Sequence, residues 1–128
     1  YVQQALTAYR KTRDTVRIFC DGEDVELQPQ QILYAEMSAR KVCLHLQGAE
    51  RDLLYTTATM ADLADLLENH GFVRTHKSVL VNMEHIRDLQ STRLYLRDGT
   101  ELPVSSHTAS AVRKIYTQWR SAKKWVIG

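Results

Sequence analysis

The chain has 128 residues, of which 44% are hydrophobic and 25% charged, and its formal net charge is +2. This length buries roughly two thirds of the surface that an unfolded chain exposes, so one domain can fold without disulfides or metals. The composition excludes a disordered tail, a collagen-like repeat and a coiled coil. No apolar run reaches the roughly 20 residues that span a bilayer, and we expect a cytoplasmic domain. The first residue is Tyr1 rather than Met, which indicates a piece of a longer protein.

The N-terminal segment has the spacing of a short helix. Val2, Ala5, Leu6 and Tyr9 fall on one side of a helix over residues 2–9. Basic residues follow at its end, where they suit the helix dipole. We interpret residues 1–14 as a helical linker that leads into the domain.

From Val16 onward, apolar residues recur at every second position, which is typical of β-strands. The turn-forming segments DGED, PQQ, SARK and QGAE separate the stretches VRIFC, VEL, ILYAEM, VCLHLQ and RDLLYTT. In VCLHL the alternation predicts that Cys43 and His45 share one face while the valine and leucines occupy the other. Cys20 and Cys43 lie singly in apolar stretches, so we expect buried thiols rather than a disulfide.

The segment TMADLADLLENHG predicts a central helix. Thr59 and Asp62 form a capping-box signal, and Gly71 supplies the C-terminal stop. The exposed face of this helix is acidic and would be repelled by phosphates, which excludes a role as a recognition helix. Its predicted apolar face consists of Met60, Leu63, Leu66 and Leu67.

The last third of the chain predicts more strands and a final helix. Asp98-Gly99 between TRLYLR and TELPV is a strong hairpin signal. Residues 108–122 return to helical spacing, with Lys114 on the polar side. The apolar side of this helix consists of Ala109, Val112, Ile115, Tyr116 and Trp119. The predicted fold is therefore mainly β, with one central helix and a helix at each end.

The charge is distributed unevenly along the chain. Residues 1–69 contain 7 Lys+Arg and 11 Asp+Glu, whereas residues 70–128 contain 10 and 4. The basic half is the candidate for binding a polyanion, and solvated faces are the alternative interpretation.

Enzymatic motifs are absent from the sequence: it contains no GxSxG, GxxxxGK[ST], GxGxxG or HExxH. Ser105-Ser106-His107 resembles a nucleophile beside a base, but adjacent strand residues point to opposite faces. Cys43 and His45 would supply only two metal ligands. We expect no catalytic residues, no metal and no cofactor.

Three polar loops have the chemistry to contact nucleic acid. They comprise residues 38–41, 74–78 and 105–108, and they contain Arg, Lys and His together with Ser and Thr hydroxyls. A helix-turn-helix is excluded because the neighbours of the acidic helix are strands. Any readout of bases must therefore come from loops.

The order of these elements resembles a known family. ILYAE, VCLHL, TMADLADLLENHGF, FVRTHKSVLVNMEHI and LYLRDGTELPVSSH resemble the LytTR DNA-binding domain of bacterial response regulators, from about residue 16 to about residue 108. The most specific element is F-x-R-x-H-K-S-x-x-V-N-x-x-x-I. The resemblance implies about ten short strands in an elongated β-β-β arrangement with one helix, and loops that enter successive grooves of DNA.

The resemblance also implies contact residues. The first base-reading position of the family falls on Arg40 or Lys41. The second falls on Lys77, with His76 and Ser78 as backbone-contact or loop-shaping groups.

At the third position the family commonly has Ser-Arg, and this chain has Ser106 in place of the Arg. Either His107 substitutes as the donor or this contact is weak. Arg113 and Lys114 could add nonspecific phosphate contacts from the final helix.

Some of these residues have structural alternatives. Arg74 is a candidate DNA contact and equally a partner for an acidic group such as Glu36. Asn82 is expected to bond loop backbone rather than a base. His76 is as suited to fixing its loop as to touching phosphate.

The leading hypothesis is the output domain of a bacterial transcriptional regulator. We expect residues 15–108 to form the DNA-binding domain and residues 109–128 a helical extension, with a receiver or other sensor domain upstream. The resemblance implies double-stranded DNA with tandem repeats as the partner, bound by two molecules, and leaves a homodimer on DNA open. The alternative is a β-rich protein-interaction or ligand-sensing module without DNA binding.

Overall fold

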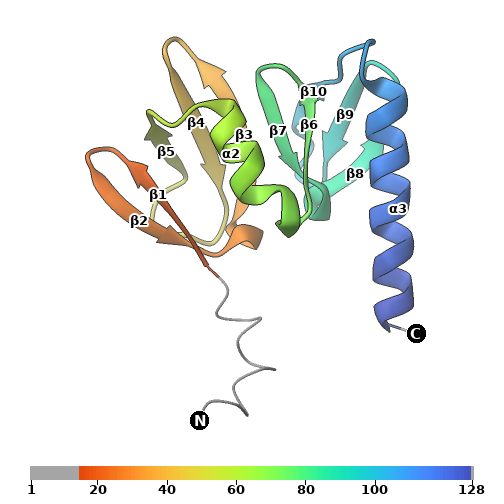
Figure 1. Cartoon of the computed structure of the whole chain (residues 1–128), viewed down its shortest axis with the longest axis horizontal. Coiled ribbons are helices and arrows are strands. Elements are labelled where there is room, and N and C mark those ends of the chain that lie inside the picture. The colour runs from red at the N-terminus through yellow and green to blue at the C-terminus, as the bar shows by residue number, and fades with distance from the viewer. Residues whose placement is uncertain (1–14, 128) are drawn as a thin grey trace.

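The computed structural model describes residues 15–127, with side chains through residue 122. The helix predicted over residues 2–9 lies outside the described residues. Ten strands and two α-helices make up the described part, which confirms a mainly β fold (Figure 1). None of the helices among the described residues is both long and apolar enough to cross a membrane.

The strands form two antiparallel sheets. The larger sheet has seven strands in the order β2-β1-β5-β4-β3-β7-β6, and the smaller has the order β10-β9-β8. The strands of the larger sheet are β1 (Val16–Cys20), β2 (Glu23–Leu27), β3 (Ile32–Ser38), β4 (Lys41–Leu46), β5 (Leu53–Thr56), β6 (Phe72–His76) and β7 (Val79–Asn82). The smaller sheet consists of β8 (Ile86–Leu89), β9 (Arg93–Leu96) and β10 (Glu101–Pro103).

Two Asp-Gly turns close hairpins. Asp21 and Gly22 both have positive φ, 49° and 87°, and join β1 to β2. The Asp98-Gly99 turn joins β9 to β10, as predicted, with Gly99 at a φ of 94°. The Asp98 carboxylate accepts the backbone N–H of Thr100 at 2.9 Å, and this hydrogen bond lowers the pKa of Asp98.

The predicted central helix is α2 (Met60–Leu67). The Thr59 hydroxyl accepts the backbone N–H of Asp62 at 3.0 Å and caps the first turn. A short 3-10 turn, Glu68–His70, continues the helix to Gly71. The prediction that Leu66 joins the apolar face is wrong, since this side chain is 41% exposed. The buried stripe of α2 is the narrower set Met60, Leu63 and Leu67.

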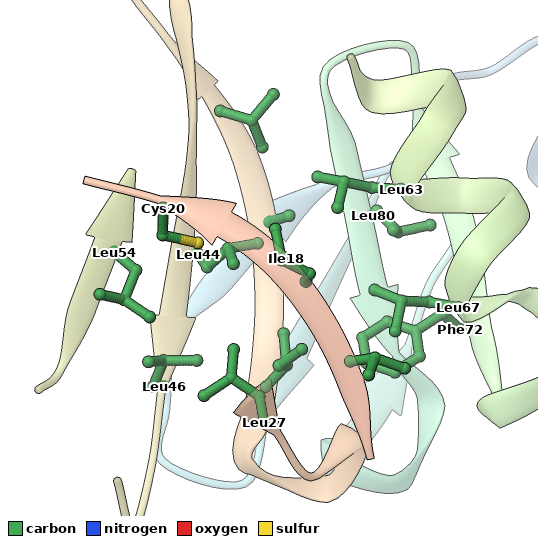
Figure 2. Packing of buried hydrophobic residues seen from close by; sticks show 14 of the residues in the cluster. Ile18, Cys20, Leu27, Leu44, Leu46, Leu54, Leu63, Leu67, Phe72 and Leu80 are labelled. Carbon is green, nitrogen blue, oxygen red and sulfur yellow. The ribbon is translucent and has the colours of Figure 1, made fainter. Parts of the chain in front are cut away.

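The first core lies between α2 and one face of the larger sheet (Figure 2). Leu63 and Leu67 point from α2 into this cluster, where alternate residues of β1 and β4 face them. In β4 the predicted alternation is confirmed, because Val42 and the two leucines belong to this core while Cys43 and His45 face the other side. Both cysteines are buried and free, as expected, and burial raises the pKa of the Cys20 thiol to about 11.

The second core lies on the opposite face of the sheet. It joins β6 and β7 to the smaller sheet and to α3 (Ala109–Ile127). Val112 is buried and Tyr116 and Trp119 pack at the margin of this core. Ile115 was predicted to be buried with them, but it is 43% exposed because the helix meets the sheet with only one narrow side.

Candidate nucleic-acid interface

The three loops singled out in the sequence lie along one edge of the molecule, the upper edge in Figure 1. They are the β3–β4 turn, the β6–β7 turn and the β10–α3 loop. β3 pairs with β7, so the first two turns are adjacent, and the Met37 backbone N–H donates to the Ser78 carbonyl at 3.0 Å. Backbone hydrogen bonds therefore connect the first turn directly to the second along this edge.

Thr75 joins the third loop to this edge. The Ser105 backbone N–H donates to the Thr75 carbonyl at 2.8 Å, and the Thr75 hydroxyl donates to the Pro103 carbonyl at 3.0 Å. The Thr108 hydroxyl also donates to the Thr75 carbonyl, at 3.3 Å. Thr75 is fully buried, so these bonds are shielded from water.

The β3–β4 turn presents two cations to solvent. Ser38 pairs with Lys41 across the hairpin, which leaves Ala39 and Arg40 as the turn residues. Ala39 has a φ of 57°, in the left-handed region. Arg40 and Lys41 are both exposed, and neither forms an ion pair with a carboxylate among the described residues.

The β6–β7 turn is held in shape by its own side chains. The Arg74 guanidinium donates to the Lys77 carbonyl at 2.6 Å. The Ser78 backbone N–H donates to Nδ1 of His76 at 3.2 Å, and the Ser78 hydroxyl lies 2.9 Å from the same nitrogen. Since a backbone N–H can only donate, Nδ1 accepts, and the ring proton of neutral His76 is on Nε2. Lys77 is exposed at the tip of this fixed turn.

The expected alternative for Arg74, a pair with Glu36, does not form. Glu36 instead lies 2.9 Å from Nε2 of His45 on the neighbouring strand. His45 in turn stacks on Tyr34, with ring centroids 4.1 Å apart. Burial, followed by the charge of Glu36, raises the pKa of the Tyr34 phenol to about 12. Glu36 is thus paired with His45 on β4, and Arg74 instead donates to the Lys77 carbonyl in its own turn.

The β10–α3 loop is polar and open to solvent. Ser106 and His107 are exposed, and the His107 backbone N–H donates to the Ser105 hydroxyl at 3.3 Å. Between the second and third loops lies an open groove. It is lined by Arg74, His76, Lys77, Ser105, His107 and Thr108.

Lys114 lies on the exposed part of α3, one helical turn after Ser110. Its neighbour Arg113 donates to the Leu89 carbonyl at 3.1 Å and so is turned toward the smaller sheet. The structure thus brings the turn and loop candidates together, whereas Lys114 does not line the groove between the second and third loops.

Asn82 and Thr75 both hold loop backbone in place, but only the role of Asn82 was predicted from the sequence. Asn82 bonds loop backbone, as expected: its amide donates to the carbonyls of Pro29 and Ile32, and its oxygen accepts the Glu84 backbone N–H. Thr75 was not identified as a site residue. The sequence pattern that could have identified Thr75 is the alternation of strand residues, because Thr75 lies two positions after Val73 and so faces the same buried side of β6.

The described residues contain no group of three or more His, Cys, Asp or Glu side chains that could hold a metal ion. The edge offers donors instead: guanidinium, ammonium, imidazole and hydroxyl groups on three braced loops. Such donors bind phosphate oxygens and acceptor atoms on base edges. Fold and loops together define a β-rich domain with a basic, loop-built edge whose donors suit a polyanion.

Comparisons with known proteins give the family. A family model described as the LytTr DNA-binding domain matches residues 22–117. The sensory transduction protein LytT of Bacillus subtilis (strain 168) is 30% identical over 134 residues, which cover 89% of this chain and 54% of that protein. The chain thus spans about half the length of this relative. The chain belongs to the LytTr DNA-binding domain family.

A solved structure shows the same fold. It is the LytTr DNA-binding domain of a response regulator from Bacillus cereus, with a TM-score of 0.66 and 24% sequence identity. The match covers 79% of this chain and 94% of that chain. The family is one of DNA-binding domains and not a class of enzymes.

Proposed function

We propose that this domain binds double-stranded DNA sequence-specifically, as the output domain of a bacterial transcriptional regulator, and reads bases with loops. The observation that carries this proposal is the bracing of three polar loops, two of which carry Arg and Lys, along one edge by Met37, Thr75 and Ser105. The membership of the chain in the LytTr DNA-binding domain family supports it.

Lys77 is the strongest candidate for direct contact with a base. Its backbone is fixed by Arg74 and by the neighbouring His76–Ser78 bonds, while its ammonium group extends into solvent. A fixed backbone reduces the ordering entropy that binding costs. Arg74 and His76 act in this proposal mainly by shaping the turn, with Nε2–H of His76 left as a donor to phosphate.

Arg40 and Lys41 form the second contact region, at the β3–β4 turn. Arginine can bind guanine O6 and N7 through two hydrogen bonds, and Lys41 can neutralise a phosphate. In the third loop Ser106 lacks a guanidinium, so His107 is the donor available there. We therefore expect weaker sequence preference at that end of the DNA site.

The whole protein is proposed to carry a receiver or other sensor domain before this one, joined by residues 1–14. The name of the LytT relative, a sensory transduction protein, supports this proposal. We further propose that the protein works in the cytoplasm and binds tandem repeats with two molecules. Residues 15–108 would form the DNA-binding unit, and residues 109–128 its helical extension.

One observation favours a second candidate, a protein-interaction module. Phe19, Leu53 and Tyr55 are 53%, 41% and 39% exposed, and they lie on the sheet face opposite the first core. Exposed aromatic residues are common at protein interfaces. This candidate leaves the basic edge without a role, so we favour DNA binding.

A titration at two salt concentrations tests the proposed function. If about four phosphates are neutralised, the affinity for duplex DNA should fall about 100-fold between ~50 mM and ~200 mM salt, because counterions are released on binding. Equal affinity at both concentrations, or no binding at either, would contradict the proposal.

A further inference from the structure

The two ends of the molecule carry opposite charge. Within residues 15–122, residues 15–69 contain 4 Lys+Arg and 10 Asp+Glu, whereas residues 70–122 contain 8 and 4. Figure 1 places the longest axis horizontally, with β1, β2 and β5 at one end and α3 with the smaller sheet at the other. The asymmetry along the sequence is therefore an asymmetry along the longest axis of the domain.

The basic end contains a groove between β8 and α3. It consists of two adjoining hollows that share Arg87 and Arg120, with Arg113 lining one of them and Arg97 the other, and we call the two together the arginine groove. Glu84 and Asp88 are the carboxylates on its walls.

These arginines are positioned by neutral groups. Arg97 and Arg113 donate to the carbonyls of Glu84 and Leu89, at 3.3 and 3.1 Å. Arg87 and Arg120 lie over the rings of Tyr95 and Tyr116, 6.0 and 5.6 Å from their centroids. Among the residues that the structure describes, none of the four forms an ion pair with a carboxylate. The groove thus has charge available for an external anion.

The acidic end contains a second groove, between β2 and the β4–β5 turn. Its charged lining consists of Glu23, Asp24, Glu26, Glu50 and Arg51, and we call it the acidic groove. The Arg51 guanidinium forms ion pairs at this same end of the molecule, 3.2 Å from the Asp21 carboxylate and 3.9 Å from the Glu23 carboxylate. Asp24 and Glu50 are exposed and have no ion-pair partner among the described residues.

The proposed DNA-binding edge runs between these two ends, parallel to the longest axis (Figure 1). A domain that lies on a duplex by this edge therefore directs its two ends along the DNA. A second copy bound in the same orientation further along the same face presents its acidic end to the basic end of the first. Contacts of this kind are head-to-tail and use two different surfaces of one chain.

We propose that the arginine groove of one copy binds the acidic groove of the next copy, when two copies occupy directly repeated DNA sites. This inference rests on the proposed function, because DNA supplies the alignment. Each exposed ion pair is weak and screened by salt, so copies free in solution stay apart. On DNA the neighbour is held at high local concentration, and the same pairs favour joint occupancy.

Charge-swap variants test this contact on DNA. The probes are duplexes with one site, or with two direct repeats spaced by about 10.5 or about 21 base pairs, so that both copies lie on one face. Arg87→Glu with Arg120→Glu reverses the arginine groove. Asp24→Lys with Glu50→Lys reverses the acidic groove. All four substitutions together restore opposite charges at the head-to-tail contact.

We expect the native chain to bind the second site about 5- to 150-fold more tightly than a single site, on at least one spacing and at low salt. Either charge reversal alone should make the affinity for the second site equal to that for a single site. The four-substitution variant should bind the second site more tightly again. Asp65→Lys on α2 with Glu68→Lys in the 3-10 turn that follows it is the matched control. These two exposed charges line neither groove, so their reversal should leave the ratio of the two affinities unchanged. Thermal unfolding of each variant verifies that it is folded.

Three results would overturn the inference. One is a native chain that binds one site and shows no cooperativity on either spacing. Another is a four-substitution variant that is folded and remains non-cooperative. The third is an arginine-groove reversal that weakens one-site binding as much as two-site binding, which would make the groove a DNA contact. Failure of the native chain to bind even the one-site duplex would instead contradict the proposed function.

Discussion

Substitution of Lys77 by alanine separates a base-reading role from a phosphate contact. The side chain is exposed at the tip of the β6–β7 turn, so its removal leaves no cavity. The turn is held through the Lys77 carbonyl, which accepts from Arg74 and is retained in the variant. We therefore expect the free energy of unfolding to change by less than about 0.5 kcal/mol, as for other exposed positions.

The effect on DNA binding should be much larger. If Lys77 reads a base, its loss should cost about 1–3 kcal/mol, which is roughly a 5- to 150-fold loss of affinity for the cognate duplex and little loss for a scrambled one. If it contacts phosphate only, both duplexes should lose affinity alike, and the salt slope should fall by about 1. Fluorescence anisotropy titrations with both duplexes measure the difference.

Arg51→Ala is the matched control for this experiment. It removes one positive charge at the end of the molecule that carries the acidic groove, away from the three loops. We expect it to leave the cognate-to-scrambled ratio unchanged. Unchanged affinity of Lys77→Ala for both duplexes would remove Lys77 from the site and refute the reasoning from its exposure and bracing.

Four further variants test the packing and the third loop. Truncation after Thr108 removes buried Val112, worth about 1.5–3 kcal/mol, and should lower the melting temperature by about 10 °C or more; an unchanged value would assign α3 to an interface instead. Gly71→Ala should cost about 1–3 kcal/mol in urea unfolding, since Gly71 has a φ of +86° and a β-carbon would lie 2.9 Å from Nε1 of Trp119. Gly48→Ala is the control for backbone strain alone, because Gly48 has a φ of +77° and open space around it. Equal losses of unfolding free energy in the two variants would show that the Trp119 contact is unimportant. Ser106→Arg should raise cognate affinity at least about fivefold by adding a guanidinium at the third loop, and no gain would place this loop away from the bases.

Local patterns predicted the elements well. The Asp98-Gly99 turn, the Thr59 cap and the alternation in β4 each depend on residues that are neighbours in the chain. The burial of individual helix positions was less predictable. Leu66 and Ile115 fit the apolar spacing of their helices, but each helix contacts its sheet through a narrower stripe, whose width is set by tertiary packing.

The assembly of the site depends on contacts between distant segments. The Ser105 N–H bond to the Thr75 carbonyl joins residues far apart in sequence, and no local pattern indicates it. The partner of Arg74 was equally unpredictable, because it depends on Glu36 being held by His45 across the β3–β4 register. The sequence therefore identified the loops, and the topology of β3, β7 and β6 determined that they share one edge.

Selection of bound sites from random duplex DNA tests the central claim most directly. The account predicts that the 128-residue chain enriches a short sequence element, and that Arg40→Ala with Lys77→Ala abolishes the enrichment while Arg51→Ala preserves it. Recovery of no element above the starting pool, or the same element from the variant that lacks both loop cations, would contradict DNA reading by these loops.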